Sequence, residues 1–338
     1  MKEVAFYQKR EDGIPRCEIC PHFCVIKPGE RGRCRVRENI DGRLYATNYG
    51  QVASLALDPI EKKPLYHFYP GSNILSLGTV GCNLECGFCQ NWALVHGEMQ
   101  VIPLAPEEMV ERAKEWRKNN NIGLAYTYSE PLMWYEYVLE TAELADLAGL
   151  KNVLVTNGFI NPQPFLTLLP FIHALNIDIK GFTKEYYRDI CGGRLEPVLK
   201  TAELAKKHAH VEITTLLVTD LNDSPEEIEE LVSWIYNHLG EDTPLHLSRY
   251  FPQFKMERPP TPLKTMEMAR EIAGKKLKYV YLGNAWELEG SNTVCPRCGQ
   301  MLIRRQGFGS VINLKDKECP ECGEKIEVVT DEKVSTLP

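Results

Sequence analysis

The stretch GCNLECGFC, residues 81–89, follows a short apolar run at 74–77 and carries three cysteines in the spacing C-x3-C-x2-C: Cys82, Cys86 and Cys89. A 4Fe-4S cluster normally takes four cysteines, so a compact trio leaves one iron open to another ligand. A zinc site would need a fourth ligand close to the loop. A ferredoxin run would continue to a further Cys-Pro pair, and none follows here. The trio therefore indicates a cluster at which chemistry can occur.

This spacing closely resembles that of the radical S-adenosylmethionine (SAM) enzymes. The resemblance implies a 4Fe-4S cluster whose open iron is chelated by the amino and carboxylate groups of SAM. It also implies that an electron from the cluster cleaves SAM to methionine and a 5′-deoxyadenosyl radical, which abstracts hydrogen from a substrate.

The size and charge of the chain fit an ordinary enzyme. Its 338 residues suffice for one large domain of roughly 200–250 residues with small appendages. A net charge of −7 argues against a protein that coats nucleic acids, because such proteins are basic. The first ten residues contain no apolar signal region, and no stretch approaches 18 uninterrupted apolar residues. We expect a cytoplasmic protein with neither a membrane nor a nucleic acid as partner.

Eleven of the twelve cysteines fall into three groups with metal-ligand spacings, which favours ligands over disulfides in a chain of this size. The groups are Cys17, Cys20, Cys24 and Cys34; Cys82, Cys86 and Cys89; and Cys295, Cys298, Cys319 and Cys322. Cys191 stands alone, and we interpret it as an incidental thiol.

Between residues 72 and 284, runs rich in branched apolar residues alternate with helical patterns, which is typical of βαβ units and a parallel sheet. The predicted strands are 73–77, 123–128, 152–156, 174–179, 211–218, 245–249 and 278–283. The predicted fold class is α/β, an incomplete (β/α) barrel with its site at the C-terminal ends of the strands. We assign 1–71 to a Cys-rich N-terminal module and connecting segment, 72–290 to the barrel, and 291–338 to a zinc-ribbon-like module and tail.

Polar residues interrupt the apolar runs where predicted strands end. Ser129 and Glu130 follow the second strand, and Glu130 or the backbone carbonyls beside it could accept hydrogen bonds from the amino group of SAM. Glu-Pro is also an ordinary helix start. Asn157 follows the third strand and can both donate and accept hydrogen bonds, although the Asn157-Gly158 pair also fits a tight turn.

Two further strands carry charged or titratable residues. Asp178 and Lys180 are two residues apart, so they point to one side of the fourth strand. A carboxylate and an ammonium on one face suit a zwitterionic amino acid, but the two could equally form a structural ion pair. His246 shares one face of the sixth strand with Ser248. A lone strand histidine is more often a core residue, yet we assign His246 to a cofactor or substrate contact.

The barrel resembles the pyruvate formate-lyase activating enzymes and, within that group, the radical SAM member of the AmmeMemoRadiSam system. Three phrases carry the finer resemblance: CPH at 20–22, EKKPLYHFYPG at 61–71 and YLGN at 281–284. The likeness covers nearly the whole chain. The formate-lyase activators have a cation-binding aspartate at the position of Val155, so their cation site does not transfer here.

The resemblance implies roles for the residues found above. The cysteine trio would hold the cluster, and Ser129 and Glu130 would lie beside the SAM amino group. Asp178 and Lys180 would contact the methionyl moiety, and His246 would fall near the nucleoside. The expected partners are an electron donor such as a flavodoxin or ferredoxin and, from the family name alone, Memo-type and AMMECR-type proteins.

The flanking cysteine groups differ in how clearly they indicate a metal. Two C-P-x-C-G knuckles, at 295–299 and 319–323, have the spacing of a zinc ribbon with a closed tetrahedral site. The N-terminal spacing C-x2-C-x3-C-x9-C matches neither a ribbon nor a ferredoxin run. We favour structural zinc there, with a second iron–sulfur cluster or free cysteines as alternatives.

The leading hypothesis is a radical SAM enzyme that acts on a protein, peptide or small molecule, with both flanking modules recruiting or covering the substrate. Within the enzyme class, a glycyl-radical-enzyme activase is the alternative. From another class, the alternative is an electron-transfer or scaffold protein whose cluster is structural.

Overall fold

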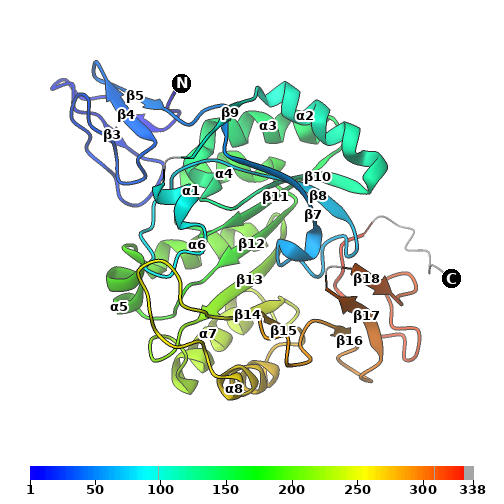
Figure 1. Ribbon diagram of the computed structural model, residues 1–338. Coiled ribbons are helices and arrows are strands. Elements are labelled where there is room, and N and C mark those ends of the chain that lie inside the picture. Colours follow the sequence, from blue (N-terminus) through cyan, green and yellow to red (C-terminus); the bar gives the residue numbers. More distant parts are fainter. Residues whose placement is uncertain (98, 308, 331–338) are drawn as a thin grey trace.

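The computed structural model describes residues 1–97, 99–307 and 309–330 (Figure 1). The predicted tail at 331–338 lies outside these ranges. The main element is an eight-stranded sheet in the order β15-β14-β13-β12-β11-β10-β8-β7. Each pair of neighbours from β8 to β15 is parallel. Among the described residues, no helix is long and apolar enough to cross a membrane.

The seven parallel strands are the seven predicted from the apolar runs. They are β8 (Asn73–Gly78), β10 (Asn121–Tyr126), β11 (Lys151–Thr156), β12 (Ala174–Asp178), β13 (His210–Leu217), β14 (Leu245–Arg249) and β15 (Val280–Gly283). The sequential strand order and the intervening helices make a partial (β/α) barrel, which confirms the predicted fold class.

One strand of this sheet was not predicted. The edge strand β7 (Ser54–Pro59) pairs antiparallel with β8, so the sheet begins within the range 1–71 that the sequence assigns to the N-terminal module and connecting segment. Its sequence, SLALDP, lacks a sustained apolar run and ends in proline, which an edge strand tolerates.

Helices follow the outer side of the sheet (Figure 1). They are α2 (Pro106–Glu115), α3 (Tyr135–Leu147), α4 (Pro162–Leu168), α6 (Leu195–Lys206), α7 (Pro225–His238) and α8 (Leu263–Gly274), with the short helices α1 (Trp92–His96) and α5 (Lys184–Tyr186). The helix α7 begins where expected, because the Ser224 hydroxyl accepts a hydrogen bond from the Glu227 N–H at 3.2 Å and Pro225 fixes the first turn. A π-helix, Tyr187–Cys191, follows α5. Single 3-10 turns occupy Ile60–Lys62, Trp116–Asn119, Pro131–Trp134 and Leu169–Phe171.

The N-terminal module contains two small sheets, β1-β5-β4 and β2-β3. Their strands are β1 (Lys2–Glu3), β2 (Tyr7–Gln8), β3 (Arg16–Cys17), β4 (Arg37–Ile40) and β5 (Arg43–Ala46), while β6 (Gln51–Val52) pairs with β9 (Ile102–Pro103). A buried ion pair joins the module to the barrel: Arg37 Nη2 lies 2.9 Å from Glu136 Oε2 on α3, with the two side chains 1% and 4% exposed.

The C-terminal module is the antiparallel sheet β16 (Thr293–Val294), β17 (Met301–Gln306) and β18 (Gly309–Ile312). It packs on the segment 60–71, which lies across the N-terminal ends of the barrel strands. Arg305 donates a hydrogen bond to the Tyr66 carbonyl at 2.7 Å, and the Ser310 hydroxyl donates one to Glu61 at 2.6 Å. Figure 1 shows this module and the N-terminal module on opposite sides of the barrel.

The side chain of Glu212 holds the segment 60–71 against the barrel. Its two oxygens accept hydrogen bonds from the backbone N–H groups of Tyr66 (3.0 Å) and His67 (2.7 Å) and lie 2.9 and 2.6 Å from the ring nitrogens of His210 and His246. Although burial favours protonation, the hydrogen bonds from His210 and His246 hold the pKa of Glu212 well below its ordinary value. The closed base of the barrel is therefore built around one buried carboxylate.

Candidate functional site

A cavity of about 220 Å³ opens at the C-terminal ends of the barrel strands, beneath the cysteine loop. Its walls include most of the residues that the sequence singled out: Cys82, Cys86, Cys89, Ser129, Glu130, Asn157, Asp178 and Lys180. These side chains come from four different strand ends, so the parallel sheet brings them to one place. Chemically, the cavity combines metal-ligating thiols with charged and hydrogen-bonding groups.

The backbone before the first cysteine requires glycine. Gly81 has φ +96°, and a Cβ atom there would lie 2.7 Å from Val36 Cγ1 and 2.8 Å from the Cys34 carbonyl oxygen. Two N–H groups point at the Cys82 sulfur, the backbone amide of Leu84 at 3.4 Å and the side-chain amide of Asn157 at 3.6 Å. Such donors stabilise a metal-bound thiolate. Asn157 therefore acts on the cysteine and also holds the predicted turn, since its Oδ1 accepts a hydrogen bond from the Phe159 N–H at 2.8 Å.

The thiol of Cys191, which the sequence suggested was incidental, contacts the site. Cys191 is fully buried on the π-helix, and its hydrogen bond to Cys86, together with burial, raises the pKa of Cys86 well above its ordinary value. Burial likewise raises the pKa of Cys82. Bound iron would offset the cost of ionising these thiols. Nothing in the local sequence around Cys191 indicated this contact.

The side chain of Glu130 holds neighbouring backbone segments of the site together through hydrogen bonds. One of its oxygens accepts hydrogen bonds from the Thr156 hydroxyl (2.6 Å) and the Leu132 N–H (3.0 Å), and the other accepts from the Asn157 N–H (2.8 Å). Burial raises the pKa of Glu130 to about 7 against the effect of these donors. Because both oxygens are engaged, Glu130 fixes the turn that carries Ser129.

Three polar atoms that line the cavity have no hydrogen-bond partner among the described residues although they are buried: Ser129 Oγ, Thr214 Oγ1 and His96 Nε2. Leaving a buried polar atom unpaired costs about 1–3 kcal/mol. The arrangement therefore fits a polar ligand that would satisfy these atoms, as SAM would. The sequence did not indicate Thr214 or His96, since neither interrupts an apolar run at a strand end.

Asp178 and Lys180 lie together at the end of β12, with Lys180 Nζ 3.1 Å from Asp178 Oδ2. Both side chains line the cavity. Although burial opposes the charged form, Asp178 and the neighbouring thiols raise the pKa of Lys180, which keeps it cationic. The pair exists, as one reading of the sequence predicted, and it presents both charges to the cavity.

His246 is the predicted site residue that the structure does not bring to the cavity. Its ring lies 2.6 Å from Glu212 and packs between Tyr66 and Tyr281, with centroids 4.7 and 5.2 Å away. Ser248, two residues further along β14, lines the cavity instead. The two residues share a face of β14, as predicted. His246 lies nearer to the closed base of the barrel than Ser248 does, and its ring hydrogen-bonds Glu212 there.

Replacing Lys180 with Met is expected to weaken SAM binding by about 1.5–3 kcal/mol, the usual worth of a hydrogen bond to a charged group. The substitution keeps an apolar stem and removes the ammonium. Titration of SAM against the reduced cluster measures the affinity, and thermal unfolding measures stability. A drop in stability with unchanged SAM affinity would show that the ion pair with Asp178 is structural only.

The Ser129→Ala variant is expected to bind SAM about 0.5–1.5 kcal/mol more weakly, since one neutral hydrogen bond is lost. Its unfolding midpoint should stay the same or rise, because the hydroxyl it removes has no partner in the protein. Thr167→Ala, which removes an exposed hydroxyl on α4, serves as the control. Equal SAM affinity in both variants would argue against a ligand contact at Ser129.

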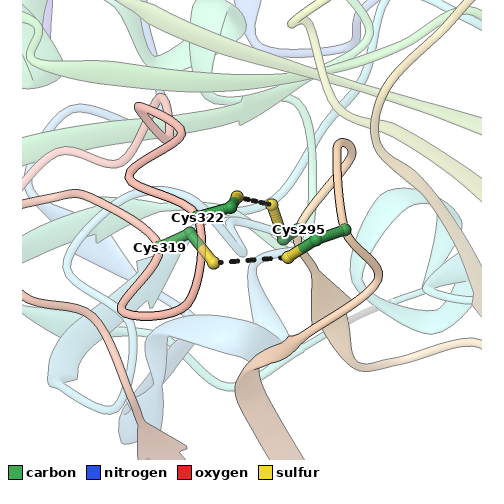
Figure 2. A group of neighbouring side chains, drawn as sticks. Cys295, Cys319 and Cys322 are labelled. Atoms are coloured by element: carbon green, nitrogen blue, oxygen red, sulfur yellow. Dashed lines mark hydrogen bonds between the residues drawn. The ribbon is translucent and has the colours of Figure 1, made fainter.

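The C-terminal cysteines form a compact group. The ligand atoms of Cys295, Cys298, Cys319 and Cys322 all lie within 4.8 Å of one another, and Figure 2 shows Cys319 and Cys322 on one loop facing Cys295 on another. Two sulfur pairs, Cys295–Cys322 and Cys298–Cys319, are 3.6 Å apart. Four thiolates around a tetrahedral zinc at about 2.3 Å would be spaced by about 3.8 Å. This group could bind one metal ion, and zinc as its identity stays a prediction.

Cys295→Ala is expected to release about one equivalent of metal and to loosen residues 291–330 while the barrel retains its iron. The reason is that three thiolates bind zinc far more weakly than four. Metal analysis and limited proteolysis would report the two effects. Retention of stoichiometric zinc, or iron found in this group, would contradict the prediction.

The N-terminal cysteines line a second, smaller cavity of about 10 Å³ together with Arg37 and His22. The four residues are Cys17, Cys20, Cys24 and Cys34. They lie next to the barrel site, because the ring of His22 hydrogen-bonds the Asn83 carbonyl at 2.7 Å. All four cysteines of the group therefore come together.

The described geometry has counterparts in known proteins. The model of the Radical SAM superfamily matches residues 76–235. An uncharacterized protein of Methanocaldococcus jannaschii, MJ0808, is 48% identical over 97% of this chain and 100% of its own length. The 4-hydroxyphenylacetate decarboxylase activating enzyme of Clostridium scatologenes is 23% identical over 33% of this chain and 37% of its own.

Among solved structures, Streptococcus suis SuiB bound to S-adenosylmethionine has a similar fold. The TM-score is 0.50 and the sequence identity 16%, over 64% of this chain and 54% of SuiB. A likeness at this identity shows the fold alone.

Proposed function

The chain belongs to the radical SAM superfamily, and from this premise we propose that Cys82, Cys86 and Cys89 hold a 4Fe-4S cluster at which SAM binds. When bound, the cluster and SAM supply a 5′-deoxyadenosyl radical that removes a hydrogen atom from a substrate. The substrate class we propose is a protein, peptide or small molecule that enters at the C-terminal ends of the strands.

One observation carries this proposal: the three thiols share a single cavity with the Asp178–Lys180 pair and with buried hydroxyls that have no partner among the described residues. A structural cluster needs only its ligands and a dry pocket. Unsatisfied donors and acceptors beside the thiols serve a second ligand with its own polar atoms. SAM, with an amino group, a carboxylate and ribose hydroxyls, is such a ligand.

Different side chains of the cavity would bind different groups of that ligand. Lys180 and Asp178 would meet the carboxylate and the amino group, and the hydroxyls of Ser129 and Thr214 would accept or donate to neighbouring polar atoms. Asn157 would donate to the Cys82 sulfur and thereby tune the cluster. Apolar lining from Leu84, Phe88 and Leu216 would keep water from the reacting atoms.

The experiment is anaerobic reconstitution with iron and sulfide, followed by SAM with and without dithionite. A catalytic cluster yields 5′-deoxyadenosine only with reductant, and SAM changes the electron paramagnetic resonance (EPR) signal of the reduced cluster. An electron-transfer or scaffold protein with a structural cluster would do neither. Absence of both effects in fully reconstituted protein would reject the proposal.

A glycyl-radical-enzyme activase is the second candidate, supported by the partial similarity to the decarboxylase activating enzyme of Clostridium scatologenes. An activase would transfer deuterium into 5′-deoxyadenosine from a protein labelled at glycine. Labelled cell extract, separated into protein and small-molecule fractions, discriminates this candidate from an enzyme that acts on a small molecule. As partners we propose a flavodoxin or ferredoxin as electron donor, and Memo-type and AMMECR-type proteins as associates.

A further inference from the structure

We propose that Cys17, Cys20, Cys24 and Cys34 hold a second iron–sulfur cluster of the 4Fe-4S type, in place of the single zinc ion that the sequence alone favoured. The inference does not rest on the proposed function of the barrel site. The features of the N-terminal module that carry it are the separation of the thiols, the cavity that they line, a buried arginine with two nitrogens unpartnered among the described residues, and the packing around the cavity.

The separation of the thiols distinguishes the cysteine groups. A tetrahedral zinc holds four sulfurs about 2.3 Å from its centre, and hence about 3.8 Å from one another. Within the described ranges, the C-terminal cysteines are the one compact group of potential metal ligands, with all four ligand atoms within 4.8 Å of one another. Among the described residues, neither the N-terminal cysteines nor the cysteine trio of the barrel forms such a compact group. The N-terminal group therefore resembles the cluster loop rather than the compact C-terminal group.

The cavity that the N-terminal cysteines line also favours a cluster over a single zinc ion. Its volume of about 10 Å³ is close to what one water molecule needs. In a zinc site, each of the four sulfurs lies about 2.3 Å from the metal position. A water-sized sphere placed at that position would overlap the sulfurs, so no such space would remain between them. A core of four irons and four sulfides, in contrast, requires the thiolates to stand apart around a central space.

The guanidinium of Arg37 lines this cavity and is 1% exposed. One nitrogen faces Glu136, but Nε and Nη1 have no hydrogen-bond partner among the described residues. Arginine donors left unpaired in a buried site indicate a missing acceptor with negative charge. The inorganic sulfides of a cluster would provide such acceptors beside the thiolates, whereas a zinc site offers only the four thiolate sulfurs.

The loops around the cavity pack closely against each other and against the cysteine loop of the barrel. A Cβ atom on Gly32 would lie 3.1 Å from Ile26 Cδ1 and 3.7 Å from Cys24 Sγ, so this loop packs closely against Ile26 beside Cys24. The same module touches the loop of the barrel cluster at two points, from His22 to the Asn83 carbonyl and from Cys34 to Gly81. The proposed second cluster therefore lies against the wall of the first.

The test uses the full chain with Cys82, Cys86 and Cys89 all changed to Ala, reconstituted anaerobically. We expect about four irons and four sulfides per chain to remain. The protein should show the broad visible absorbance typical of iron–sulfur proteins, and its EPR signal on reduction should not change when SAM is added. Adding Cys20→Ala and Cys24→Ala should remove this iron. Cys191→Ala, in place of those two changes, is the matched control and should retain it.

Should the triple variant fail to fold, the metal content of the wild-type chain decides. About eight irons and one zinc per chain support the second cluster, while about four irons and two zincs overturn it. In the variant that lacks Cys82, Cys86 and Cys89, iron that stays after Cys20 and Cys24 are also replaced would overturn it as well. Because none of these readouts is SAM cleavage, a failure here is distinguishable from a failure of the proposed radical SAM function.

Discussion

The Cys82→Ala variant is expected to form no 5′-deoxyadenosine above background, and Cys89→Ala should behave in the same way. Two thiolates cannot retain a cubane that normally takes four ligands, so the iron of the barrel site should fall by about four per chain. Chromatographic detection of 5′-deoxyadenosine after dithionite reduction measures the activity, and iron and sulfide analysis measures the cluster.

Cys86 needs a more careful design because the Cys191 thiol contacts it. In Cys86→Ala the Cys191 thiol stays next to the emptied position, so the variant is compared with the double variant Cys86→Ala/Cys191→Ala, which excludes Cys191 as a replacement ligand. Cys191→Ala alone is the control and should keep both iron and SAM cleavage. Robust 5′-deoxyadenosine formation by Cys82→Ala or Cys89→Ala would disprove the assignment of the cluster ligands.

Glu212→Gln is expected to lower the free energy of unfolding by about 3–5 kcal/mol, the range for breaking a buried charged network. The carboxylate accepts hydrogen bonds from two backbone amides and two histidine rings. A glutamine amide nitrogen cannot accept any of them, so some of these donors would be left unpaired in the core. Guanidinium unfolding followed by circular dichroism measures the loss.

The matched control is Glu241→Gln, which removes an exposed partner of Lys278 and should cost less than about 1 kcal/mol. His246→Asn tests the same network from the other side: it should destabilise the protein while leaving SAM affinity unchanged, because His246 lies outside the cavity lining. Equal stability of Glu212→Gln and Glu241→Gln would mean that the base does not depend on this carboxylate.

The sequence predicted the features that depend on local chemistry. Each parallel strand has its own apolar run, and four of the predicted strands end in polar residues, so the strands and the side chains at these four ends could be located before the structure. Ser129, Asn157 and Lys180 were found in this way because position along the chain and position along the barrel axis coincide at a strand end. The spacing of cysteines likewise carries its meaning within a few residues.

The remaining features depend on distances that the sequence does not contain. A period of two assigned His246 and Ser248 to one face, but it could not tell which of them reaches the cavity, since that depends on the stagger of neighbouring strands. Cys191 meets Cys86 only because a π-helix folds back onto the cluster loop. The edge strand β7 was missed because its partner β8, rather than its own pattern, makes it a strand.

The position of the C-terminal module has a practical meaning for handling the protein. The module is bonded to the segment 60–71 at the closed base, through Arg305 and Ser310, while the cavity opens at the other end of the strands. A surface-immobilised or fused protein attached through this module would therefore present its open end to solution. Any large substrate could then be offered to the barrel without competing for space with the attachment.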